Sequence, residues 1–239
     1  RRAGPTDDPE SANRLLVAHC PERVLPGKIM EEMAANDRVI GGLNPLSTDR
    51  AKQLYSSFCN GEMLLTNATT AEMAKLTENS FRDVNIAFAN ELSIISDKLG
   101  IDVWELIELA NHHPRVNILN PGPGVGGHCI AVDPWFIVSS AQEEAKLIRT
   151  AREVNDGKPA YVIAKITEAV EAEGADSIAA LGIAFKPDID DLRESPALSI
   201  VQQMAEKWPE KNILVAEPNV NELPESCLLY TSDAADDTP

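Results

Sequence analysis

Basic side chains are scarce in this sequence. Its 239 residues hold 21 Lys and Arg against 38 Asp and Glu, which gives a formal net charge of −17. Nucleic-acid phosphates are bound by clustered Lys and Arg, so binding of DNA or RNA is excluded as a main activity. The excess of acid predicts a well-solvated surface and does not predict a fold.

Paired cysteines and long apolar runs are also missing. No CxxC pair or metal-ligand spacing occurs, so we expect no metal site. No apolar run is long enough to span a bilayer, and residues 1–16 carry charge without the apolar core of a signal peptide. We therefore expect a cytoplasmic protein with reduced thiols and no membrane partner. The cysteines are Cys20, Cys59, Cys129 and Cys227.

The remaining pattern predicts an α/β protein with one unusually long helix. This helix is expected over residues 69–99, with Thr69 and Glu72 as a capping box and Gly100 as its stop. Apolar residues recur along it at helical spacing. Because the helix is longer than most globular helices, we expect it to pack against a partner.

Shorter predicted elements surround the long helix. A strand, a helix and a strand over residues 177–185, 196–208 and 212–219 predict a βαβ unit with a parallel sheet. Strands are also expected from residue 15 and over 37–42. Helices are expected over 47–59, with Ser47 or Thr48 as the N-cap, and over 103–113, with Asp102 and Glu105 as a capping box. Two more helices are expected over 141–155 and 159–174, the second with Pro159 in its first turn.

The segment Asn120–Pro134, NPGPGVGGHCIAVDP, places four glycines and three prolines around Cys129. A dinucleotide site needs a strand before its glycines, and Pro121 and Pro123 lack amide donors, so we exclude that function. Glycines would let the backbone approach a ligand, and a helix starting at the cysteine would favour the thiolate of a nucleophile. A tight turn around a buried, inert cysteine is the alternative.

Other candidate residues are weaker when taken singly. Lys75 and Asn79 lie four residues apart on the long helix, where they could steady an oxyanion or form part of a solvated face. Asp133, four residues after the cysteine, would share a helical face with it. Glu22 and Lys186 follow predicted strands, where ligands often bind.

Four ordered motifs together resemble the UDP-glucose/UDP-mannose dehydrogenase family, over about Leu15 to Pro224. They are CPERVLPGK, AEMAKLTENSFRDVNIAFANEL, NPGPGVGGHCIAVDPWFIV and GIAFKPDIDDLRESPA. The resemblance implies the end of an N-terminal Rossmann domain (1–66), a helical middle domain with a long central dimerisation helix (67–173), and a truncated C-terminal Rossmann-like domain for UDP (174–226). Residues 227–239 are expected to be a non-native tail.

The resemblance implies an NAD-dependent, four-electron oxidation of a UDP-N-acetylhexosamine. The glycine segment differs from the glycine–aromatic–glycine and CLPKD pattern of UDP-glucose enzymes, which favours an N-acetylhexosamine. UDP-N-acetyl-D-mannosamine is the substrate that the resemblance implies, and UDP-N-acetyl-D-glucosamine stays open. The uronate product would serve bacterial surface polysaccharides such as enterobacterial common antigen. The NAD fingerprint would lie upstream of residue 1, so this chain alone is expected to be inactive.

The family's motifs also imply residue roles. Cys129 is the expected nucleophile, which would hold the reacting carbon as a thiohemiacetal and then as a thioester. By motif, Lys75 and Asn79 would steady the oxyanion, Asp133 would move water or a proton, and Glu22 would assist thioester hydrolysis.

The motifs imply binding roles for other residues. Arg115 would reach substrate across the homodimer, and Val125 and Gly126 would contact substrate. Phe185 and Lys186 would hold UDP, and Arg193 would approach NAD.

Two other classes of function stay open. A cysteine hydrolase or acyltransferase would pair Cys129 with a histidine, although the adjacent His128 would point elsewhere on a helix. A dimerising, UDP-binding module without catalysis would need only the middle and C-terminal parts of the chain.

Overall fold

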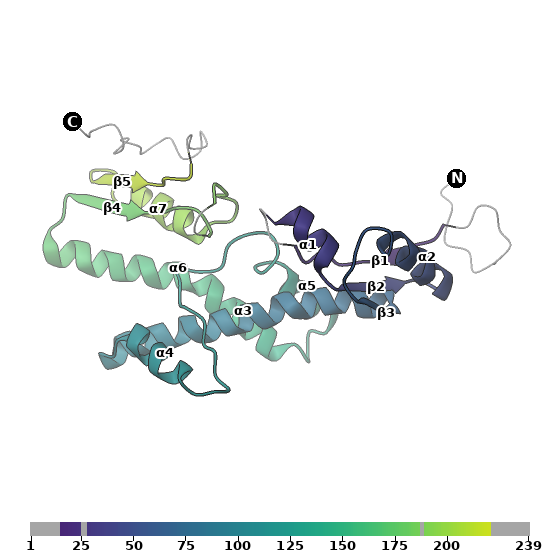
Figure 1. Ribbon diagram of the computed structural model, residues 1–239. Coiled ribbons are helices and arrows are strands. Elements are labelled where there is room, and N and C mark those ends of the chain that lie inside the picture. The colour runs from purple at the N-terminus through teal and green to yellow at the C-terminus, as the bar shows by residue number, and fades with distance from the viewer. Residues whose placement is uncertain (1–14, 25–27, 187–188, 221–239) are drawn as a thin grey trace. The chain divides into compact units, whose positions relative to one another are not determined.

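A computed structural model describes residues 15–24, 28–186 and 189–220 (Figure 1). The chain divides into two compact units, residues 1–78 and 79–239, and helix α3 (Ala68–Leu99) contributes to both. The predicted tail over 227–239, with Cys227, lies outside the described residues.

The first unit contains a three-stranded sheet. β2 (Arg38–Gly42) lies in the centre, antiparallel to β1 (Ala18–His19) and parallel to β3 (Met63–Asn67). Helix α1 (Ile29–Ala35) connects the first two strands, and α2 (Pro45–Tyr55) connects the last two and packs on β2. Every residue of β2 is buried, so this strand forms the core of the unit.

Helix α2 begins earlier than the sequence predicts. Asn44 is its N-cap, because its side chain accepts the N–H of Ser47 at 2.9 Å and Pro45 occupies the first turn. The hydroxyl of Thr48 instead accepts the N–H of Gly42 at 2.9 Å. The prediction of Ser47 or Thr48 was wrong because the fixed φ of Pro45 starts the helix sooner, with its N-cap three residues before Ser47.

The N-caps of the other helices follow the sequence only in part. Helix α3 begins at Ala68, and the side chain of Asn67 accepts the N–H of Thr70 at 2.9 Å, so Thr69 lies within the helix and is not its N-cap. For α4 (Val103–Asn111) the predicted cap is confirmed, since Asp102 accepts the N–H of Trp104 at 2.8 Å.

The second unit contains the predicted βαβ element. β4 (Ser177–Leu181) and β5 (Asn212–Ala216) are parallel, and α7 (Pro196–Lys207) connects them. Ser195 is the N-cap of α7, as the sequence indicates. A small core lies between these strands, α7 and α6 (Lys146–Glu173). Its buried side chains are Ile183, Ile200, Val201, Met204, Ala205 and Ile213.

Helix α6 is one helix where the sequence predicted two. Pro159 lies in its interior and not in a first turn. A proline at such a position removes one helical hydrogen bond and costs about 3 kcal/mol. The neighbouring Asn155 and Lys158 are buried and hydrogen-bonded to α3, so tertiary contacts hold the helix together on the N-terminal side of the proline.

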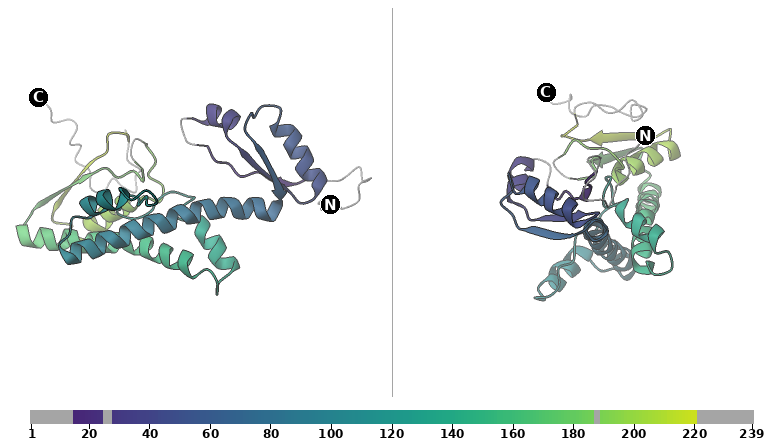
Figure 2. Two further views of the ribbon diagram at one scale, coloured as in Figure 1. Left: turned by 60° about the horizontal axis from the view of Figure 1, so that its bottom comes forward. Right: turned by 90° about the vertical axis from the view of Figure 1, so that its right-hand side faces the viewer.

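Helices α3 and α6 run alongside each other within the second unit (Figure 2). Buried polar side chains join them. Arg152 pairs with Asp83 at 2.6 Å, with side chains 1% and 0% exposed. Asn155 donates to Asp83 at 2.8 Å and accepts from Asn90 at 2.8 Å, and Lys158 donates to the Asn90 carbonyl at 3.4 Å. We call these five residues the polar seam.

Burial shifts two charged groups of the seam, Asp83 and Lys158, toward their neutral forms. It raises the pKa of the Asp83 carboxyl, and the positive charge of Arg152, with hydrogen bonds from Arg152 and Asn155, offsets this only in part. Burial likewise lowers the pKa of Lys158. Each charge in the seam therefore depends on the partners that surround it.

Replacing Arg152 by Met is expected to lower the free energy of unfolding by roughly 3–5 kcal/mol, because Asp83 would stay buried without its partner. Urea denaturation of this chain measures the change. The control is Lys165→Met, since Lys165 pairs with Asp97 and Glu168 at the surface, where ion pairs contribute little. Equal losses in the two variants would contradict the importance of the seam.

Candidate active site

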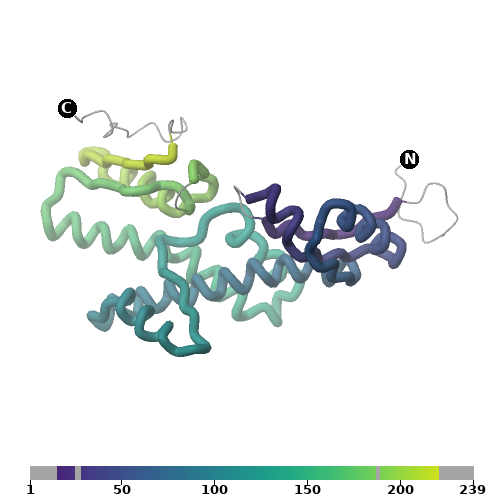
Figure 3. Tube along the Cα trace, in the orientation of Figure 1, coloured from purple at the N-terminus to yellow at the C-terminus, as the bar shows by residue number. Residues whose placement is uncertain are grey.

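The glycine-rich segment forms a loop between α4 and α5 (Asp133–Ser140), and we call residues 120–132 the glycine loop (Figure 3). Near its start, the N–H of Gly122 donates to the side-chain oxygen of Asn90 at 2.8 Å. At its end, the side chain of Asn79 donates to the carboxylate of Asp133 at 2.6 Å. Both asparagines belong to α3, so this helix holds the loop at two points.

Two glycines of the loop permit a close approach to the βαβ element. A Cβ atom at Gly126 would lie 2.6 Å from the carbonyl oxygen of Glu194 and 2.7 Å from the Cβ of Phe185. Gly127 has a φ of +81°, and a Cβ there would lie 3.0 Å from the Phe185 ring. The structure thus brings together Gly126 and Phe185, two of the residues predicted to bind substrate.

Cys129 lies in a turn and not in a helix. Its carbonyl accepts the N–H groups of Val132 and Asp133 at 3.1 and 2.8 Å, and α5 begins only at Asp133. The predictions that Cys129 starts a helix and shares its face with Asp133 were therefore wrong, because the chain turns before the helix begins. The Cys129 side chain is exposed, which removes the alternative of a buried, inert thiol.

An amide and a carboxylate meet where this turn enters α5. Asn79 is buried, so it does not belong to a solvated helix face, and its Nδ2 atom orients the Asp133 carboxylate. Lys75 lies four residues earlier on α3 and is half-buried. The arrangement offers a hydrogen-bond donor and a proton acceptor next to the turn that carries an exposed thiol.

Glu22 is fixed by several donors in the first unit. Its carboxylate accepts from Nη1 of Arg38 at 3.0 and 3.1 Å and from the backbone N–H groups of Arg23 and Val24 at 2.7 and 3.1 Å. Burial raises the pKa of Glu22, but these hydrogen bonds outweigh it and leave the pKa below its usual value. Glu22 is therefore an anion near neutral pH.

The predicted nucleotide-binding cations lie at the surface of the second unit. Arg193 donates from Nε and Nη2 to the carboxylate of Asp191 at 2.8 and 2.6 Å, and this pairing lowers the pKa of Asp191 to about 2. The ammonium of Lys186 lies 5.5 Å from the centre of the Phe185 ring. Arg115 is exposed beyond the end of α4.

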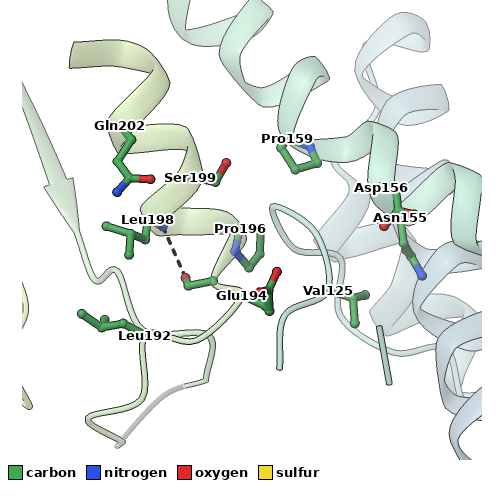
Figure 4. A pocket seen from close by; sticks show the side chains of 11 residues that line it. Val125, Asn155, Asp156, Pro159, Leu192, Glu194, Pro196, Leu198, Ser199 and Gln202 are labelled. Carbon is green, nitrogen blue, oxygen red and sulfur yellow. Dashed lines mark hydrogen bonds between the residues drawn. The ribbon is translucent and has the colours of Figure 1, made fainter. Parts of the chain in front are cut away.

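A pocket of about 430 Å³ lies between the glycine loop, α6 and the first turn of α7 (Figure 4). Val125, a predicted substrate contact, lines it, and much of the remaining wall is polar. Cys129, Asn79 and Asp133 do not line this pocket, so it is separate from the thiol. The other lining residues are Asn155, Asp156, Pro159, Leu192, Glu194, Ser195, Pro196, Leu198, Ser199 and Gln202.

Sequence reasoning missed the polar side of α3. Asn79, Asp83, Asn90 and Asp97 recur at intervals of four, seven and seven residues, which places them on one side of a helix. The prediction followed the apolar residues instead, yet Phe88 is 54% exposed. The spacing of short polar side chains was the signal that could have found the seam.

The glycine loop lacks the strand that a dinucleotide fingerprint requires, and the described residues hold no cluster suited to a metal. The G-x-G-x-x-G run at Gly122–Gly127 has no strand before it, as the sequence indicates. Among the described residues, no three His, Cys, Asp or Glu side chains could jointly hold a metal ion. In the same residues, no helix combines the length and apolar character needed to cross a membrane.

Replacing Gly126 by Ala is expected to lower the free energy of unfolding by about 1–3 kcal/mol, because the new methyl group would clash with the Glu194 backbone. Gly157→Ala is the matched control, since a Cβ at Gly157 in α6 would meet no atom within 4 Å. That change is expected to stabilise by about 0.5–1 kcal/mol. Thermal unfolding measures the stability of both variants. If both are stabilised to the same extent, the close approach at Gly126 is ruled out.

Comparison with known proteins assigns all three parts of the chain to one family. Residues 6–59, 69–157 and 179–238 match the NAD binding, central and UDP binding domains of the UDP-glucose/GDP-mannose dehydrogenase family. The second sugar nucleotide of that family is GDP-mannose, not the UDP-mannose named above. The domain boundaries and the non-native tail predicted above stay predictions.

Individual relatives agree with this assignment. A UDP-N-acetyl-D-mannosamine dehydrogenase of Campylobacter jejuni is 63% identical over 210 residues, which cover 88% of this chain and 51% of the relative. An NDP-N-acetyl-D-galactosaminuronic acid dehydrogenase of Ralstonia nicotianae (strain ATCC BAA-1114 / GMI1000) is 60% identical over 210 residues, covering 88% and 49%. The chain spans about half the length of the curated relatives it matches.

A solved structure supports the fold. The UDP-N-acetyl-mannosamine dehydrogenase of S. aureus matches with a TM-score of 0.78 and 50% identity, covering 87% of this chain and 49% of that one. The predicted α/β architecture is confirmed by this match. The chain is a member of the UDP-glucose/GDP-mannose dehydrogenase family.

Proposed function

We propose that this chain is part of an NAD-dependent enzyme that oxidises UDP-N-acetyl-D-mannosamine to UDP-N-acetyl-D-mannosaminuronate. The observation that carries the proposal is the exposed thiol of Cys129, in a turn held to α3 through Asp133 and Asn79. The identity to the Campylobacter jejuni relative supports the substrate. Because the chain spans half the length of its relatives, the activity belongs to a longer protein.

A second UDP-N-acetylhexosamine is also compatible with this reaction. UDP-N-acetyl-D-glucosamine 6-dehydrogenation is the alternative, since it needs the same groups around the reacting carbon. The Ralstonia nicotianae relative, named for a galactosaminuronic acid, is nearly as similar to this chain as the Campylobacter jejuni relative. Overall identity therefore does not choose the epimer.

A thiol explains how one carbon can be oxidised twice in a single site. Oxidation of the primary alcohol would first give an aldehyde, and the Cys129 thiolate would add to it to form a C–S bond and a thiohemiacetal. Loss of a second hydride from that carbon would give a thioester, and water would release the acid and the thiol. NAD supplies the acceptors for the two hydrides.

Asn79 and Asp133 would act on the oxygen atoms of this sequence. An asparagine amide has two N–H donors, and the contact with Asp133 commits one of them. The other donor, together with Lys75, would steady the oxyanion that forms when the thiolate adds. Asp133 would move the proton or the water.

Glu22 would accept a proton from the water that attacks the thioester, which its anionic state permits.

The remaining roles are contacts to the nucleotide sugar and NAD. Arg115 would reach substrate across a dimer, Val125 and Gly126 would contact the sugar through the backbone, Phe185 and Lys186 would hold UDP, and Arg193 would approach NAD.

Most of the NAD site is expected outside the described residues. Arg193 is the one contact to NAD that we predict from this chain, and its guanidinium is paired with Asp191. NAD phosphates would have to compete with that carboxylate.

The uronate would serve bacterial surface polysaccharide synthesis in the cytoplasm.

The exposed side of α3 supports a homodimer through this helix. Phe81, Phe88 and Ile95 recur every seven residues in the second unit, and all three are exposed. Large apolar side chains at this spacing form a stripe of the kind that packs against another helix.

Replacing Phe88 by Lys is expected to weaken the dimer at least about tenfold, because a charge would be buried in the apolar stripe. Light scattering after size-exclusion chromatography, over a range of concentrations, measures the dissociation constant. The control is Gln203→Lys on the exposed side of α7. A dimer that is unchanged by Phe88→Lys would exclude this surface.

A non-catalytic, UDP-sugar-binding dimerisation module is the second candidate. It is favoured by the match of residues 179–238 to the UDP binding domain. A cysteine hydrolase has less support, because within the described residues no hydrogen bond joins the Cys129 thiol to a histidine.

The decisive assay follows NADH in the full-length enzyme that carries this segment. Two NADH are expected per UDP-N-acetyl-D-mannosamine, and Cys129→Ala is expected to slow their formation by on the order of 10³-fold or more. Cys20→Ala, at a half-buried cysteine of the first unit, is the matched control. Binding of UDP without NADH formation by the unaltered protein would favour the non-catalytic module.

A further inference from the structure

Asn90 uses both ends of its side-chain amide in the interior. It is 0% exposed, its Oδ1 atom accepts the N–H of Gly122 at 2.8 Å, and its Nδ2 atom donates to Asn155 at 2.8 Å. Nothing in the resemblance or in the reaction described above gives this residue a role.

The polar seam dictates which way this amide points. A carboxylate only accepts hydrogen bonds, so Asn155 must turn its NH₂ group toward Asp83, where the distance is 2.8 Å. Its oxygen then faces Asn90, which must turn its own NH₂ group toward Asn155. The oxygen of Asn90 is thereby left to face Gly122.

Gly122 is the residue of the loop best suited to receive this contact. It stands between Pro121 and Pro123, which have no N–H, so it supplies the only backbone donor of the three. Glycine also has the largest conformational freedom to lose. One hydrogen bond to a rigid helix therefore restrains a segment that would otherwise be loosely held at its start.

We propose that Asn90 is a positioning residue for Cys129, acting through Gly122 to fix the start of the glycine loop. The inference rests on the proposed function, in which Cys129 is the nucleophile. Asn79 holds the far end of the same loop through Asp133, so loss of Asn90 leaves the thiol tethered on one side only. A thiol that must attack one carbon atom and stay bonded to it through a hydride transfer and a hydrolysis needs both restraints.

Three variants separate this role from general support of the core. Asn90→Ala removes the acceptor of the Gly122 N–H, whereas Asn90→Asp keeps an acceptor at that position. Asn155→Ala is the matched control, because it removes the acceptor of the Asn90 NH₂ group, while the Gly122 N–H, which can only donate, still selects the Asn90 oxygen. Urea denaturation of each variant gives the global stability against which local effects are judged.

The first measurement is hydrogen exchange at the Gly122 amide by NMR, under conditions where each variant is folded. Asn90→Ala is expected to speed exchange about tenfold, while Asn90→Asp and Asn155→Ala leave it close to the unaltered rate. Unchanged exchange in Asn90→Ala, or equal acceleration in Asn155→Ala, would overturn the proposal.

The second measurement is the mobility of a nitroxide label on Cys129, with the other three cysteines replaced by Ala. Greater mobility in Asn90→Ala, restored by Asn90→Asp, is expected, and equal mobility in all variants would overturn the positioning role. Neither measurement uses substrate or NAD. A failure of the proposed function would instead appear as absent NADH formation, with both of these results intact.

Discussion

The buried ion pair between Asp83 and Arg152 is the interaction on which the second unit depends. Removing two charges from water is costly, and neighbouring groups must offset part of this cost by donating hydrogen bonds to the pair. Asn155 does so from α6, and that requirement fixes the orientation of Asn155 and then of Asn90. The buried carboxylate of Asp83 thus sets the direction of a chain of hydrogen bonds that reaches the glycine loop.

The loop itself is shaped by what its glycines allow. Gly126 and Gly127 let the backbone approach Phe185 more closely than any side chain would permit. Asn79 and Asn90 hold the loop from α3, while Cys129 stays exposed in the turn before α5. Rigidity at both ends and access at the thiol are the two properties that covalent catalysis requires of such a segment.

Local sequence signals predicted the elements whose causes are local. Ser195 with Pro196 starts α7, Asp102 caps α4, and the βαβ unit forms as its pattern indicates. Pro159 shows where this reasoning fails, because contacts with α3 outweigh the local cost of a proline inside α6. The seam was missed because the burial of Asp83 depends on a helix about 70 residues away in the chain.

The most direct test of the account is to trap the covalent intermediate. Full-length enzyme containing this segment would be mixed with UDP-N-acetyl-D-mannosamine and NAD, quenched in acid, digested and examined by mass spectrometry. The account predicts that the peptide containing Cys129 gains the mass of the sugar nucleotide as a thioester. NADH formation with no adduct at Cys129, or with an adduct at another residue, would contradict the central claim.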